Sequence, residues 1–146
     1  MSDPLYTTDI LRLAADIPHL GLLDRADFSV TKVSPICGSR VTASVRLSGH
    51  TVAHYGQEVR ACALGQASAA IVGQHVIGQR LDVFPSLLAA MQAFLKGDGP
   101  HPQGEWSQTH IFAPAQQHKA RHASILLPYQ ALADIAVQAA QTQMAQ

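Results

Sequence analysis

Apolar and polar residues alternate most regularly between residues 40 and 47, where the sequence reads RVTASVRL. Every second residue is apolar, which is the period of a β-strand with one buried face. The apolar positions are Val41, Ala43, Val45 and Leu47. The turn SGHT at 48–51 joins this strand to VAHYGQEVRAC at 52–62, so the pattern predicts an antiparallel hairpin. A third strand, with an imperfect alternation at Lys32, is predicted over DFSVTKV at 27–33.

Two segments that flank these strands carry helical signals. LYTTDILRLAADI at 5–17 follows Asp3-Pro4, and because proline suits the first turn of a helix we expect a helix to start there. PHLG at 18–21 ends that helix. After the hairpin, GQASAAIVGQHVIG at 65–78 predicts a closely packed helix of small residues.

The second half of the chain is predicted to contain two more helices and a long loop. VFPSLLAAMQAFLKG at 83–97 indicates a helix, with Asp82 as a candidate cap and Gly97 as its end. DGPHPQGEWSQTH at 98–110 is rich in Gly and Pro and is predicted to be a loop. A last helix is expected from about Pro128 to 145, with a polar end that frays.

This order of elements predicts the fold class. A helix, then strands, then helices indicates an α+β domain with a small, about three-stranded antiparallel sheet and helices packed on one face. A chain of 146 residues is most simply a single domain, 1–146, and is large enough to bury a core without disulfides or metals. Its 47% hydrophobic and 14% charged residues are typical of a globular protein rather than a disordered one.

Charge and hydropathy exclude several classes of function. Ten basic and ten acidic residues are scattered along the chain, so no basic strip is available to bind nucleic acid. The N-terminal sequence lacks the pattern of a signal peptide, and no apolar run is long enough to span a bilayer. We therefore expect a cytoplasmic protein with reduced thiols and no membrane partner.

The chain has two cysteines, Cys37 and Cys62. Cys37 lies in a Pro- and Gly-flanked turn before one hairpin strand, and Cys62 follows the other and opens a helix, whose N–H groups stabilise a thiolate. Because the hairpin returns the chain antiparallel, both residues should lie at the same end of the sheet. The pattern predicts a shared metal or sulfur site, but two buried core cysteines remain an alternative.

His122 is the third candidate, because it precedes the last predicted helix. A neutral imidazole there can ligate zinc or iron beside two thiolates. Alternatively, His122 belongs to a solvated basic loop with His118, Lys119 and Arg121. No G-x-S-x-G elbow, phosphate loop, H-E-x-x-H motif or carboxylate pair is present, so we do not expect an enzyme.

The sequence resembles the U-type iron–sulfur cluster scaffold proteins, IscU and the N-terminal part of NifU, from about Tyr6 to Ala139. In that family the first ligand lies in an Ala/Pro-x-Cys-Gly-Asp motif, matched here by PICGS. The second lies in Gly-Cys-x-x-x-x-Ala-Ser, matched by ACALGQAS, and the third in a His-Cys pair, where this chain has RHASILL. The loose similarity of PHLG to the turn after the family's first helix agrees with this.

The resemblance implies a ligand set of Cys37, Cys62 and His122, because two family positions differ. The motif aspartate is Ser39 here, and the third cysteine is Ala123. The implied cargo is iron or an Fe–S cluster, with zinc as another occupant of the same site. The implied partners are a cysteine desulfurase and apo iron–sulfur proteins, and a cluster bridged between two chains would make a homodimer.

Two alternatives remain open. The SufE-type sulfur acceptors share this fold and use a Gly-Cys-x-Ser-x-Val pattern, which CGSRV fits through Ser39 and Val41. That resemblance implies a persulfide on Cys37, formed and passed on by exchange chemistry. A degenerate module that kept the fold and lost the chemistry is the other alternative.

Overall fold

The structure is a computed structural model that describes residues 5–144. Three strands are followed by helices, as the sequence predicts. The helical elements are α1 (Thr8–Ala14), α2 (Ala63–His75), α3 (Phe84–Lys96), α4 (His122–Met144) and the 3₁₀ segments η1 (Leu81–Val83), η2 (Gly104–Gln117) and η3 (Lys119–Arg121). The strands are β1 (Phe28–Val33), β2 (Arg40–Ser48) and β3 (Thr51–Arg60).

The strands form one antiparallel sheet in the order β1-β2-β3, so the α+β prediction is confirmed. Ser48 pairs with Thr51 at the hairpin turn, and Arg40 pairs with Arg60 at the other end of the same two strands. The register shifts between Arg46 and Leu47, where a bulge interrupts the ladder. β2 thus leads away from the turn that contains Cys37, and β3 returns the chain to the same end of the sheet.

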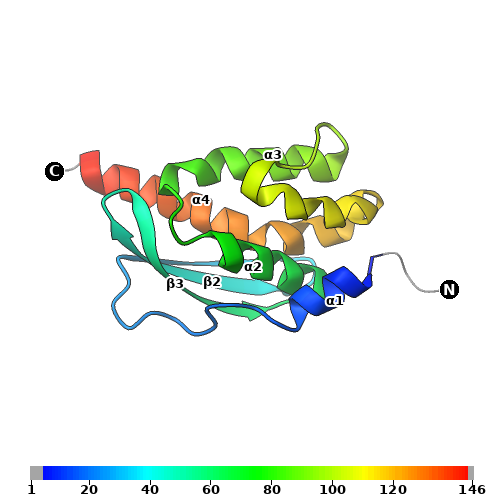
Figure 1. Ribbon diagram of the computed structural model, residues 1–146, viewed down its shortest axis with the longest axis horizontal. Coiled ribbons are helices and arrows are strands. Elements are labelled where there is room, and N and C mark those ends of the chain that lie inside the picture. The colour runs from blue at the N-terminus through cyan, green and yellow to red at the C-terminus, as the bar shows by residue number, and fades with distance from the viewer. Residues whose placement is uncertain (1–4, 145–146) are drawn as a thin grey trace.

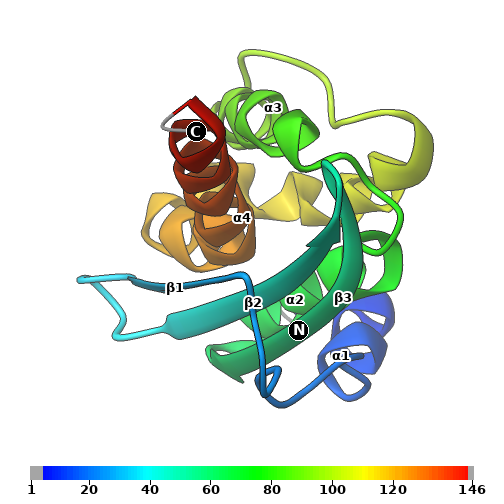
Figure 2. The same cartoon turned by 90° about the vertical axis from the view of Figure 1, so that its left-hand side faces the viewer.

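Helices cover one face of the sheet (Figure 1). α4 packs on β1 and β2, α2 packs on β3, and α1 and α3 add to this layer by packing on α2 and α4 (Figure 2). The buried face of β2, with Val41, Ala43 and Val45, contributes to the core between sheet and helices. None of the helices in the described part of the chain has both the length and the apolar character needed to cross a bilayer.

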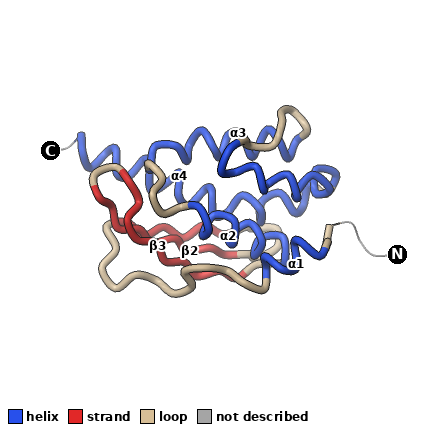
Figure 3. The backbone as a smooth tube through the Cα atoms, viewed as in Figure 1, coloured by secondary structure: helices blue, strands red, loops and turns tan. Residues whose placement is uncertain are grey.

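The long loop between α1 and β1 runs along the side of the sheet away from the helices (Figure 3). The backbone N–H of Leu23 in this loop donates to Ser44 Oγ at 3.1 Å, and Ser44 Oγ donates to the carbonyl of Gly56 at 3.0 Å. Ser44 lies on the face that the alternation assigns to solvent, yet it is buried because the loop covers it.

Lys32, the interruption in the first strand, lies on the half-buried side of β1. Its Nζ lies 2.9 Å from a carboxylate oxygen of Asp134 on α4. Both side chains are substantially exposed, so the ion pair contributes little free energy of folding. It explains how a lysine occupies a position that the pattern reserves for an apolar residue.

Two predicted helix starts are corrected by the structure. α1 begins at Thr8 rather than directly after Pro4, with Thr7 as the N-cap whose Oγ1 accepts a hydrogen bond from the N–H of Ile10 at 3.3 Å. Asp3 and Pro4 lie outside the described residues. Asp82 does not cap α3, because its carboxylate pairs with Arg80 at 3.0 Å, whereas Gly97 ends α3 as predicted, with a φ of 79°.

The last helix begins at His122 and not near Pro128, so that prediction was wrong by almost two turns. Proline usually marks a first turn, and inside a helix it removes one N–H···O bond. Here the residues before it, including Ile125 and Leu127, are almost fully buried, and this packing holds the helix through the proline. His122 and Ser124 therefore lie in the first turn of α4 rather than in a loop.

The predicted loop at 98–110 is wrong over its second half, because η2 starts at Gly104. Its buried side chains recur at every third residue, which is the period of a 3₁₀-helix. These residues are Trp106, Thr109, Phe112 and Ala115. This repeat of three differs from the period of two of a strand and of 3.6 of an α-helix, so neither pattern indicates it.

Candidate functional site

Cys37 and Cys62 line one open cavity of about 310 Å³, between the turn that precedes β2, the end of β3, the N-cap of α2 and the short segment η3. Arg60 and Arg121 line it with them. The structure thus places both thiols at the same end of the sheet, as the hairpin predicts. Both thiols are free, with Cys37 exposed and Cys62 half-buried.

The turn that carries Cys37 is held by its own backbone. The N–H of Ser34 donates to the carbonyl of Ser39 at 2.8 Å, and the N–H of Gly38 donates to the carbonyl of Ser34 at 2.9 Å. Gly38 has a φ of 72°, a conformation that residues with a Cβ rarely adopt. The turn therefore depends on glycine at this position to present the neighbouring sulfur to solvent.

Two hydroxyl groups surround the sulfur of Cys37. Its Sγ lies 3.3 Å from Ser34 Oγ and 3.1 Å from Ser39 Oγ, and both serines are buried. The hydrogen bonds with Ser34 and, second, with Ser39 lower the pKa of the Cys37 thiol below its ordinary value. An exposed thiol of lowered pKa is the form that acts as a nucleophile or soft metal ligand.

Cys62 has a different setting, as the N-cap residue of α2. Its Sγ lies 3.4 Å from the hydroxyl of Ser124, in the first turn of α4. Helices α2 and α4 approach closely here because residue 65 is glycine: a Cβ at Gly65 would meet Ser124 Oγ and Ala61 Cβ. The glycine therefore makes room for the contact between thiol and hydroxyl.

A chain of hydrogen bonds joins the two thiols. Ser124 Oγ donates to Ser39 Oγ at 3.2 Å, so the path runs from Cys62 through Ser124 and Ser39 to Cys37. Each hydroxyl has one hydrogen, and Ser124 uses its hydrogen to donate to Ser39. The Cys62 thiol must therefore donate to Ser124, and the hydrogen of Ser39 is available to donate to Cys37. Both hydroxyl residues are buried, at 4% and 0% exposure, so solvent does not compete for these bonds.

The sequence patterns did not indicate Ser34 or Ser124 as members of this site. Ser124 is 62 residues from Cys62 and 85 from Ser39, and these contacts follow only from the packing of α4 against the sheet and α2. Ser39 departs from the scaffold motif, which has aspartate there, but it fits the motif of the sulfur acceptors. The available signal was its alternative match, with the Cys-x-Ser pattern placing a hydroxyl two residues after the thiol.

His122 does not line the cavity of the two thiols. It is half-buried at the start of α4, and its Nε2 lies 2.8 Å from the carbonyl oxygen of Ala115. A carbonyl only accepts, so Nε2 carries the hydrogen. In the described part of the chain, no three His, Cys, Asp or Glu residues are grouped to hold a metal ion. The set of Cys37, Cys62 and His122 therefore stays a prediction.

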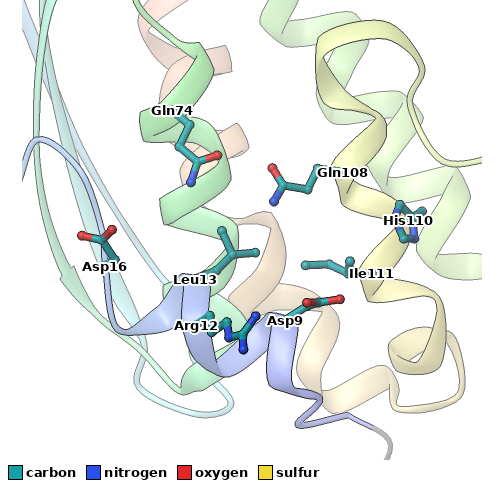
Figure 4. Close-up of a pocket in the computed structure, with 8 residues that line it drawn as sticks. All are labelled: Asp9, Arg12, Leu13, Asp16, Gln74, Gln108, His110 and Ile111. Atoms are coloured by element: carbon teal, nitrogen blue, oxygen red, sulfur yellow. The ribbon is translucent and has the colours of Figure 1, made fainter.

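A second cavity, of about 380 Å³, lies between α1, α2 and η2 (Figure 4). Asp9 and Arg12 from α1, Gln74 from α2 and His110 from η2 contribute to its lining. It contains no thiol. The thiol chemistry of this protein is therefore confined to the cavity at the end of the sheet.

A family model for the NifU-like N-terminal domain matches residues 5–122. The chain belongs to this family. Its members are iron–sulfur cluster assembly scaffolds of the IscU and SufU type, which bind Fe–S clusters and typically work with a cysteine desulfurase. A comparison with curated proteins found no match.

Solved structures of similar fold agree with the family. The N-terminal part of a nitrogen-fixing NifU-like protein from Brucella abortus is 39% identical, with a TM-score of 0.87 over 90% of this chain and 92% of that one. A candidate iron–sulfur cluster assembly scaffold protein for the SUF system of Fervidobacterium islandicum is 19% identical, with a TM-score of 0.77 over 90% of this chain and 96% of the other. At that identity the second likeness shows the fold alone.

Proposed function

We propose that this NifU-like chain is a scaffold that binds iron, an Fe–S cluster or zinc through Cys37, Cys62 and His122. The observation that carries the proposal is that both thiols line one cavity. Thiolates are the ligands that Fe–S clusters and zinc prefer. The proposal needs no turnover, so the protein acts as a carrier rather than an enzyme.

His122 is the third ligand in this proposal. The bond from Nε2–H of His122 to the Ala115 carbonyl leaves Nδ1 with a free lone pair, and metal-bound histidines commonly hold their other nitrogen in this way. Ser39 and Ala123 replace the aspartate and cysteine of the family motifs, so one chain offers three donors where a [2Fe–2S] cluster takes about four. A second copy of the chain would supply the rest.

A second candidate function is sulfur transfer through Cys37. Its exposure and lowered pKa favour attack on a persulfide. The Cys37 thiolate would bond to the terminal sulfur of a desulfurase persulfide, and the desulfurase cysteine would leave as a thiolate, so no external oxidant or reductant is needed. Cys62 has no necessary role in this reaction.

Both functions imply the same partners and setting. We infer a cysteine desulfurase as the source of sulfur and apo iron–sulfur proteins as acceptors, in the cytoplasm. Residues 1–146 would act as one domain, and the single large core that joins sheet and helices supports this inference.

Metal analysis with a UV–visible spectrum, before and after anaerobic incubation with iron and sulfide, tests the scaffold function. We expect wild type to gain iron with charge-transfer bands, and Cys37→Ser and Cys62→Ala to gain none. Persulfide detection on Cys37 after incubation with a desulfurase and cysteine separates the alternative. If Cys62→Ala still binds metal, the proposed ligand set is wrong. If neither wild type nor the variants bind metal but Cys37 takes sulfur, the protein is a sulfur acceptor.

A further inference from the structure

The cavity of the two thiols has a strongly uneven charge. Arg60 and Arg121 line it, and no carboxylate does. Within the described residues, the ion pairs are Lys32 with Asp134 and Arg80 with Asp82, so neither lining arginine is neutralised by one. A protein with zero formal net charge thus places two unpaired guanidinium groups beside its reactive sulfur.

A third arginine, Arg40, is the cross-strand neighbour of Arg60 but does not line the cavity of the two thiols. Arg40 and Arg60 are directly opposed across β2 and β3, an arrangement of like charges that is destabilising. Glu58 lines a separate cavity together with both arginines but forms no ion pair with either. An anion bound beside Arg60 would relieve this repulsion. The arrangement therefore favours a negatively charged occupant of the cavity.

We propose that this cavity admits small thiols and disulfides that carry carboxylate groups, and that Cys37 exchanges with them. Arg60 and Arg121 would bind the carboxylates, since guanidinium pairs with carboxylate in a bidentate fork. Cys37 is exposed on the same cavity of about 310 Å³. A small ligand whose carboxylates are bound by the arginines would therefore place its sulfur near the sulfur of Cys37. The proposal does not depend on metal or cluster binding.

The reaction is thiol–disulfide exchange. The Cys37 thiolate attacks one sulfur of the small disulfide R–S–S–R, forming the mixed disulfide Cys37–S–S–R and breaking the original S–S bond. The other half leaves as R–S⁻. In the reverse direction, a small anionic thiol releases Cys37 from the mixed disulfide. The small disulfide is itself the oxidant, and no other co-reactant is needed.

The test compares three disulfides with matched two-carbon arms and different charge: dithiodipropionate (anionic), 2-hydroxyethyl disulfide (neutral) and cystamine (cationic). Mass spectrometry follows mixed-disulfide formation on Cys37 in the full chain, and again in Cys62→Ser, where one thiol remains. The rate with dithiodipropionate is divided by the rate with cystamine. This ratio is then divided by the same ratio for a small neutral thiol, which corrects for the intrinsic reactivity of the two disulfides. The ionised fraction of Cys37 cancels in this ratio, so the ratio reports the charges around Cys37, and the arginine variants show which residues supply them.

We expect the normalised ratio to exceed one by about ten-fold at low salt, and to fall about three-fold in Arg60→Gln and in Arg121→Gln. At 1 M salt the preference should vanish. Arg46→Gln, which removes an exposed arginine from the neighbouring strand β2 and away from the cavity, is the matched control. A ratio near one in wild type, or an equal fall in Arg46→Gln, would overturn the proposal.

Discussion

The two thiols of this protein share a cavity but differ in almost every other respect. Cys37 is exposed, lies in a turn held by Gly38, and has two hydroxyl groups at its sulfur. Cys62 is half-buried at the start of a helix and has a single hydroxyl partner. Cys37 is therefore accessible to reactants in solvent, whereas the packing of α2 and α4 confines Cys62.

The difference is produced by the elements that carry each sulfur. A turn can place a side chain in solvent, whereas the start of α2 is confined by α4. The serine chain through Ser39 and Ser124 ties both sulfurs to one arrangement, so a change at the interface of α2 and α4 should affect Cys62 first. Variants that act on one thiol and not the other test this distinction.

The largest effect is expected from Gly65→Ala. A methyl group there would collide with Ser124 Oγ and Ala61 Cβ and would push α2 from α4. Overpacking typically costs about 1–3 kcal/mol, and this substitution should lie at the upper end because both new contacts are far closer than van der Waals separation. Alanine regains about 1 kcal/mol over glycine in a helix. We expect the free energy of unfolding, measured in urea, to fall by about 2 kcal/mol.

Gly99→Ala is the matched control for this substitution. Its added Cβ would lie 3.6 Å from the Cβ of Ala93, an ordinary contact, so stability should be unchanged. Alkylation of Cys62 should become faster in Gly65→Ala alone. Equal stability of Gly65→Ala and wild type would show that α2 and α4 are not in the close contact described.

Ser124→Ala should have the next largest effect. The substitution removes a fully buried hydroxyl that joins Cys62 to Ser39, at an expected cost of about 1–2 kcal/mol of unfolding free energy. Ser48→Ala, at an exposed position at the end of β2, is the control. Cys62 should react faster with a neutral alkylating reagent, and a larger rate change at Cys37 than at Cys62 would contradict the assignment of Ser124 to the Cys62 side.

The sheet, and with it the meeting of the two thiols, could be predicted from the sequence because strand alternation and hairpin turns are local signals. β2 and β3 follow the predicted segments closely, and they determine where Cys37 and Cys62 lie. Ser34, Ser124 and Gly65 were not predicted as site residues. Their roles arise where α4 meets α2 and the sheet, and a contact across more than 60 residues leaves no periodic trace in the sequence.

The start of α4 shows the same limit in another form. The last helix was predicted to begin near Pro128, and proline is common in the first turn of a helix. Burial of the preceding residues overrides it, and the helix begins six residues earlier, at His122. Local propensity failed here because the deciding term is tertiary packing. The consequence reaches the site, because Ser124 can contact Cys62 only from the first turn of this helix.

Gly38→Ala should perturb Cys37 while leaving Cys62 in place. The added Cβ meets no atom within 4 Å, so the cost is the backbone conformation at a φ of 72°, about 1 kcal/mol. Gly38→Asn is the conservative partner, because asparagine tolerates this region better than alanine. We expect urea unfolding to rank the glycine protein above Asn and Asn above Ala, with Cys62 alkylation the same in all three. No loss in Gly38→Ala would mean that the turn is free to relax.

The smallest change in stability, and the most selective for one thiol, is expected from Ser34→Ala. Its hydrogen bond is the first cause of the lowered pKa of Cys37, so its removal should raise that pKa toward the ordinary thiol value. In a Cys62→Ser background, the rate of alkylation by iodoacetamide follows the fraction of Cys37 that is thiolate. This rate should reach half its plateau at a higher pH in Ser34→Ala.

Ser39→Ala should move the midpoint of this pH profile in the same direction but less, because its hydrogen bond is the second cause of the lowered pKa. Ser29→Ala, on the exposed side of β1, is the control and should leave the midpoint unchanged. A downward shift in Ser34→Ala would show that this hydroxyl stabilises the thiol rather than the thiolate, and Cys37 would lose its distinction from Cys62 as the nucleophile.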